Sequence, residues 1–164
     1  MINLGYDQVV FVPAYKPPHK QDAPSASAEE RLAMLELALN GRSDFLVETW
    51  ELERRGISYT IDTVHHLYET RDVEGRLGLI IGDDLVEGFY GWKNAEELER
   101  QVDIIVATRR GEDGNGLRYS TIDNSPLPVS SSEVRERVRS GKAFRYLVPE
   151  SVYGYIQTHD LYSS

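Results

Sequence analysis

Short apolar runs rich in β-branched residues alternate with stretches that carry apolar residues at helical spacing, and no other feature constrains the fold as strongly. The runs are Val9–Val12, Phe45–Val47, Leu77–Ile81 and Ile104–Ala107. Apolar runs of this length between helices are typical of a parallel sheet that helices cover on both faces. A length of 164 residues suits one core. We therefore predict an α/β fold in a single domain over residues 1–164.

Capping signals and apolar spacing predict where the helices lie. Ser27 and Glu30 have the spacing of a capping box, and Gly41 is expected to end the helix that follows them. Asn94 and Glu97 repeat the capping-box spacing. Further helices are predicted over residues 60–70, after Ser130 and after Pro149. The positions expected to face the core are Leu32, Leu35, Ala38 and Leu39; Ile61, Val64, Leu67 and Tyr68; Val134 and Val138; and Val152, Tyr155 and Ile156.

Charge and composition exclude several classes of protein. The formal net charge is −9, whereas a nucleic-acid-binding protein needs a basic face that neutralises phosphates. Without cysteine, the chain forms neither disulfides nor a cysteine-ligated zinc site. No apolar run approaches the ~20 residues of a membrane helix, and residues 1–7 lack the order of a signal peptide. We expect a cytoplasmic protein with no nucleic-acid or membrane partner, and we leave open whether identical copies associate.

Polar residues follow the predicted strands at the edge where parallel sheets bind ligands. His19 and Lys20 lie in a loop stiffened by prolines, Gly82 and Asp84 end the third run, and Arg109 follows the fourth. Each feature has a simpler alternative, namely a surface loop, a strand end and a solvated turn. Together they suit a small phosphorylated ligand, for which a few local cations suffice.

A run of three serines, Ser130 to Ser132, precedes a predicted helix that carries Arg135 in its first turns. The N–H groups at the start of a helix bind anions, and a guanidinium clamps phosphate oxygens. A simple helix cap is the alternative for the serines. Trp92 offers a flat face for a ring, or it packs against the core. His65 and His66 are interpreted as one face of a helix.

Six segments occur in an order that resembles the bacterial nicotinate-nucleotide adenylyltransferases. They are Val9–Lys20, Ser58–Thr60, Ile81–Asp84, Trp92–Lys93, Thr108–Gly111 and Val129–Arg135. The resemblance implies a Rossmann-like nucleotidyltransferase fold and an enzyme of NAD biosynthesis. The implied reaction joins ATP and nicotinate mononucleotide, with Mg²⁺ assisting, to give deamido-NAD and pyrophosphate. The implied partners are therefore these two small molecules.

The resemblance also implies roles for individual residues. At the ATP phosphates it implies His19, Lys20, Ser130, Ser132 and Arg135, with Ser132 where threonine is usual in the family. Near the adenosine it implies Gly82, Asp84 and Arg109, and at the nicotinate mononucleotide Tyr59, Thr60, Trp92 and Lys93. It assigns no protein ligand to a metal.

The family hallmark, Gly-x-Phe-x-Pro-x-His-x-Gly-His after a first strand, does not occur in these residues. We therefore expect the first β-α unit to be missing, leave the catalytic residues unassigned, and expect little activity from this polypeptide alone. His65 and His66 lack the glycine loop and do not substitute. Two alternatives stay open. One is a non-catalytic nucleotide-binding remnant, and the other is a sister enzyme that acts on nicotinamide mononucleotide or pantetheine phosphate.

Overall fold

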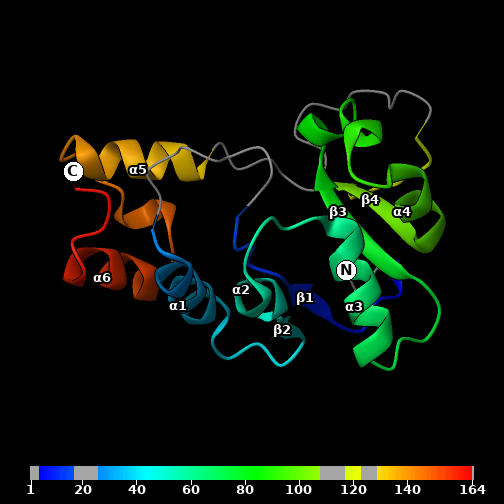
Figure 1. Cartoon of the computed structure of the whole chain (residues 1–164). Coiled ribbons are helices and arrows are strands. Elements are labelled where there is room, and N and C mark those ends of the chain that lie inside the picture. The colour runs from blue at the N-terminus through cyan, green and yellow to red at the C-terminus, as the bar shows by residue number, and fades with distance from the viewer. Residues whose placement is uncertain (1–3, 17–25, 108–116, 123–128, 164) are drawn as a thin grey trace. The chain divides into compact units, whose positions relative to one another are not determined.

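The computed structural model describes residues 4–16, 26–107, 117–122 and 129–163 (Figure 1). The chain forms two compact units. The split unit consists of Met1–Ile57 and Pro128–Ser164, and the continuous unit consists of Ser58–Leu127. Within the ranges above, no helix has the length and apolar character needed to cross a membrane.

A three-stranded parallel sheet forms the centre of the continuous unit. Its order is β3 (Leu77–Gly82), β4 (Val102–Ala107) and β5 (Ser120–Ile122), with Leu77 opposite Val102 and Gly82 opposite Ala107. β4 alternates least between buried and exposed positions, because only Asp103 and Ala107 among its six residues are not buried. Its central place in the sheet explains the nearly continuous apolar sequence.

Helices α3 (Thr60–Thr70) and α4 (Ala95–Gln101) pack on this sheet unit around one apolar core. Two short 3-10 helices, η2 (Asp83–Leu85) and η3 (Phe89–Gly91), lie between β3 and α4. The largest fully buried side chains of the unit are Phe89, Ile61, Leu98, Ile105, Val102 and Val106.

The split unit combines a pair of parallel strands with helices. β1 (Val9–Phe11) pairs with β2 (Phe45–Val47), and all six of their residues are half-buried. The helices are α1 (Ala28–Leu39), α2 (Trp50–Arg54), α5 (Ser131–Arg139), η4 (Arg145–Leu147) and α6 (Glu150–Thr158). Their core contains Val134, Phe144, Val152, Ile156 and Leu161.

Most sequence predictions of structure are confirmed. The strands are parallel, Ser27 and Glu30 form the predicted capping box, and Ile61, Val64 and Leu67 are buried on α3. The predicted stripe on α1 is confirmed in part: Leu32, Leu35 and Leu39 are half-buried, whereas Ala38 is exposed. The residues of this helix that pack on the core among the helices are Met34 and Leu37. The segments β5 and α2 were not predicted. Whether residues 1–164 act as one domain stays a prediction.

The capping box predicted at the start of α4 is also wrong in its contacts. Asn94 is the cap residue, but it has a left-handed backbone with φ 52° and its side chain makes no capping bond. The Asn94 side-chain amide instead donates to Glu97 Oε2 at 2.9 Å. The turn before the helix therefore determines the geometry here, since Asn tolerates the left-handed region better than most residues.

Candidate functional site

Residues at the start of α3 and in the segment before α4 come together in the continuous unit. Tyr59 precedes α3, and the Lys93 ammonium lies 4.6 Å from the centroid of the Tyr59 ring. Tyr59 and Trp92 are both half-buried and pack against the same core. Thr60 is the first residue of α3 and follows Tyr59 directly. The four residues expected around a mononucleotide thus come from two neighbouring segments of one unit.

Trp92 is anchored through Phe89, which is completely buried. The backbone N–H of Trp92 donates to the Phe89 carbonyl at 3.0 Å. The ring centroids of Trp92 and Phe89 lie 5.5 Å apart at an interplanar angle of 38°. Because a fully buried ring holds Trp92 on one side, the indole has a fixed base while part of it stays accessible. A stacking platform needs this combination of rigidity and access.

Lys93 forms an ion pair that the sequence did not suggest. Its ammonium donates to both carboxylate oxygens of Asp62, at 2.8 and 3.1 Å. Asp62 is in the first turn of α3. Opposite charges at this distance compensate each other, so Lys93 contributes little net positive charge to its surroundings.

Gly82 and Asp84 lie at the carboxyl end of β3. A Cβ atom at position 82 would overlap Asp84 Oδ1, so glycine is the residue that lets this carboxylate fold back over the strand end. The Asp84 N–H donates to Asp83 Oδ1 at 3.0 Å, and the Asp84 side chain is exposed. This turn presents a carboxylate at the edge of the sheet where parallel strands end.

The start of α5 belongs to the split unit. Ser130 Oγ accepts the Glu133 N–H at 3.1 Å, so the interpretation of this serine as a helix cap is confirmed. Ser132 Oγ accepts a hydrogen bond of 3.0 Å from Arg135 Nη2, which directs the guanidinium back toward the first turn. In the part of the chain that the structure describes, the N–H groups of Ser131 and Ser132 have no acceptor. Serine hydroxyls, two free donors and a cation thus gather at one helix end.

Near this helix lies the Tyr162 phenol. Burial raises the pKa of Tyr162, and the positive charge of Arg135 offsets part of that increase. The phenol oxygen also accepts the Ala26 N–H, just before the Ser27 cap of α1. The chain end thereby connects the start of α1 with α5.

Three of the predicted site residues, His19, Lys20 and Arg109, lie outside the described residues. No three His, Asp or Glu side chains in the described ranges come together as metal ligands.

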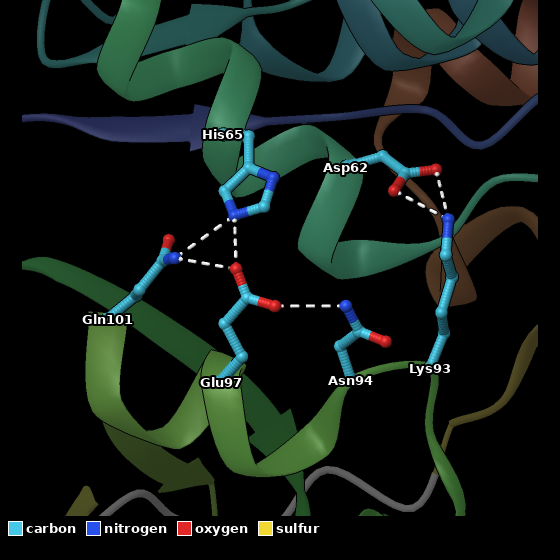
Figure 2. Close-up of polar contacts among 6 residues, drawn as sticks. All are labelled: Asp62, His65, Lys93, Asn94, Glu97 and Gln101. Carbon is cyan, nitrogen blue, oxygen red and sulfur yellow. Dashed lines mark hydrogen bonds and ion pairs between the residues drawn. The ribbon is translucent and has the colours of Figure 1, made fainter.

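Sequence reasoning missed a set of polar contacts between α3 and α4. His65 Nε2 lies 2.9 Å from Glu97 Oε1, and Gln101 Nε2 lies 3.0 Å from His65 Nε2 (Figure 2). His65 was interpreted as a helix face, which is correct, but its partner is 32 residues away in the chain. Only spacing on both helices could have suggested the pairing.

Known proteins resemble this chain over nearly its full length. The model of the cytidylyltransferase-like family matches residues 2–137. Proteins named nicotinate-nucleotide adenylyltransferase from Salinibacter ruber and Treponema pallidum are 37% and 36% identical to it. These matches cover 97% and 99% of this chain, and 84% and 87% of the relatives. The chain belongs to the nicotinate-nucleotide adenylyltransferases, within the cytidylyltransferase-like family.

Solved structures agree with this family in fold. The nicotinic acid mononucleotide adenylyltransferase of Plasmodium falciparum, complexed with NaAD, is similar with a TM-score of 0.75 at 17% identity. The same enzyme complexed with APC gives a TM-score of 0.71 at 16% identity. Both matches cover 96% of this chain and 83% of the other. The predicted Rossmann-like nucleotidyltransferase fold is therefore confirmed.

Proposed function

We propose that this adenylyltransferase chain serves the transfer of the adenylyl group of ATP to nicotinate mononucleotide. An oxygen of the mononucleotide 5′-phosphate attacks the α-phosphorus of ATP, the bond from that phosphorus to the β-phosphate oxygen breaks, and pyrophosphate leaves. The products are deamido-NAD and pyrophosphate. The observation that carries the proposal is the identity of 35–37% to proteins of that name over 97% or more of this chain.

The start of α5 suits the phosphates of ATP. The free N–H groups of Ser131 and Ser132 would donate to phosphate oxygens, and the Ser130 and Ser132 hydroxyls lie beside them. Arg135 already points toward the first turn through its bond to Ser132. Fixed donors aimed at an anion stabilise charge without reorganisation during the reaction. We assign His19 and Lys20 to the same phosphates.

Trp92 and its neighbours suit the nicotinate ring. The anchored indole would stack on the pyridine, while Tyr59, Thr60 and Lys93 line the adjoining edge. Because Asp62 compensates the Lys93 charge, backbone N–H groups are the better candidates for selecting the carboxylate over an amide. We assign Gly82, Asp84 and Arg109 to the adenosine.

Mg²⁺ enters the proposal as part of the substrate, magnesium–ATP. This cation prefers phosphate oxygens and keeps several of its waters. The chain's own contribution is to hold the two substrates in line and to compensate charge. We propose the cytoplasm as the place of action.

Two measurements test the proposal: binding of ATP and of nicotinate mononucleotide by calorimetry, and release of pyrophosphate. We expect the 164-residue chain to bind both substrates and to release pyrophosphate only when both are present. Binding of neither substrate contradicts the proposal, and tighter binding of the amide mononucleotide would assign the sister activity.

A matched pair of variants on α5 tests the phosphate site. Arg135→Gln should weaken ATP binding about tenfold, because hydrogen bonds to charged groups contribute about 1.5–3 kcal/mol. Arg139→Gln removes the same charge from the same helix, where Arg139 pairs with Glu136 at the surface. Equal losses in the two variants would reduce the effect to net charge and contradict the proposed phosphate contact.

A further inference from the structure

Three polar contacts join α3 to α4 and the segment before it, and we call them the polar seam. They are Asp62 with Lys93, His65 with Glu97, and Tyr68 with the Gln101 carbonyl, the last at 2.8 Å. The partners on α3 are three residues apart, and those on the other segment are four residues apart. These are the two spacings that place side chains on one face of a helix. The seam therefore runs along one face of α3. On the other side Glu97 and Gln101 belong to α4, whereas Lys93 precedes that helix.

Supporting contacts fix each level of the seam. Asn94 donates to Glu97 from one side and Gln101 donates to the same carboxylate from the other, at 2.9 and 3.1 Å (Figure 2). The Tyr68 hydroxyl also accepts the Leu77 N–H at 3.0 Å, which connects the seam to β3. Asp62, the acid of the first level, is only 24% exposed. Partial burial reduces the screening that makes exposed ion pairs weak.

The first level of the seam holds the segment that contains Trp92. Lys93 follows Trp92 directly, and its ammonium is fixed by Asp62 and by the face of Tyr59. Trp92 itself has Phe89 as its anchor on the preceding side. The indole is thus held from both directions along the chain, by an apolar contact before it and an ion pair after it.

We infer that Asp62 is a positioning residue that acts through Lys93 to hold Trp92 in place for the pyridine ring of the mononucleotide. The inference rests on the proposed function for the identity of that ring. Asp62 needs no contact with the substrate in this role. Because a neutral ion pair has no net charge to offer, its loss should weaken binding of the acid and of the amide mononucleotide alike.

The test uses the full chain with Trp50→Phe, which leaves Trp92 as the remaining one of two tryptophans. Acrylamide quenching of its fluorescence measures accessibility without ligand, and titration with nicotinate mononucleotide measures binding. Asp62→Asn and Lys93→Gln should each raise the quenching constant and weaken binding about two- to fivefold. ATP affinity, measured by calorimetry, should not change.

Coupling between the two partners distinguishes positioning from direct contact. The double variant Asp62→Asn with Lys93→Gln should lose no more than either single variant. Asp62→Glu, which keeps a carboxylate, should recover most of the affinity. The control is Asp103→Asn, which removes the ion pair between Arg76 and Asp103 at the amino ends of β3 and β4, and it should leave quenching and binding unchanged.

Each remaining outcome decides against one statement. Unchanged quenching and binding in Asp62→Asn, or additive losses in the double variant, would overturn the positioning role. If the unaltered chain binds neither mononucleotide, the proposed function fails. In that case, unchanged acrylamide quenching in Asp62→Asn would still overturn the positioning of Trp92 by Asp62.

Discussion

The two units cover their strands to different extents. In the continuous unit, Ile105 and Val106 of β4 are each 1% exposed, with β3 and β5 on either side. In the split unit, none of the residues of β1 and β2 is fully buried, and α1 has no buried residue either. Burial of apolar surface is the main stabilising contribution to folding. The continuous unit therefore has a core of its own around its sheet, while the described core of the split unit lies among helices.

The largest expected effect is a loss of stability in the core of the continuous unit. Leu98 is completely buried, so Leu98→Ala should lower the free energy of unfolding by about 2–5 kcal/mol. The matched variant Leu46→Ala, on half-buried β2, should cost only about 1 kcal/mol. Urea unfolding followed by circular dichroism measures both. Equal losses would remove the difference between the units.

Backbone hydrogen exchange should show the same contrast at single residues. The amides of Ile105 and Val106 lie in a strand paired on both sides, whereas Val10 pairs with β2 alone among the described strands. We expect exchange at β4 to be slower by about tenfold or more, because opening a central strand requires wider unfolding. Exchange measured by NMR at neutral pH decides this, and faster exchange at β4 would contradict it.

A smaller effect is expected at the helix caps, where the split unit has the better-formed contacts. Ser27→Ala removes a complete capping box on α1 and should cost about 1 kcal/mol. Asn94 makes no capping bond on α4, so the cost of Asn94→Ala should come instead from its left-handed backbone. Asn94→Gly therefore should cost less than Asn94→Ala. At position 27, where φ is −55°, glycine has only its general N-cap preference over alanine and no left-handed backbone to relieve. Thermal unfolding of the four variants measures the difference.

The smallest effect concerns the pair of Arg42 and Asp44 on the surface of the split unit. The hydrogen bond from Arg42 lowers the pKa of Asp44. A carboxyl group whose pKa is lower in the folded state stabilises the fold above its unfolded pKa, and this contribution is lost as pH falls through the folded value. Arg42→Ala should raise the pKa of Asp44 and remove that part of the acid dependence. An NMR titration of the Asp44 side chain measures it, and an unchanged pKa would contradict the assigned cause.

Sequence periodicity predicted the buried face correctly where the pattern of apolar residues within one helix determines it. The α3 face with Ile61 and Val64 was correct, because a strongly amphipathic helix has one stable orientation. The α1 stripe was correct only in part, because apolar residues occur around much of that helix. Ala38 is exposed, and Met34 and Leu37 are the residues that pack on the helical core. The strand β5 was missed because Ser120 and Thr121 are exposed and polar.

The sequence predicted which residues form the candidate site, but not which side chains contact one another there. The motifs named Trp92 and Lys93, yet Asp62 was absent from every prediction, since its partner lies 31 residues away. Such pairings depend on how two helices pack, which spacing within one helix does not specify. The roles of Ser130, Ser132 and Arg135 in phosphate binding stay predictions.

The division of the chain into units affects the order in which its parts can fold during synthesis. Synthesis proceeds from the first residue to the last, and domains fold as they emerge. The continuous unit is complete at Leu127, whereas all five buried apolar residues of the split-unit core belong to Pro128–Ser164. The whole of the continuous unit is therefore synthesised after β1 and β2 and before α5 and α6. β1 and β2 are thus synthesised before the continuous unit and stabilised after it.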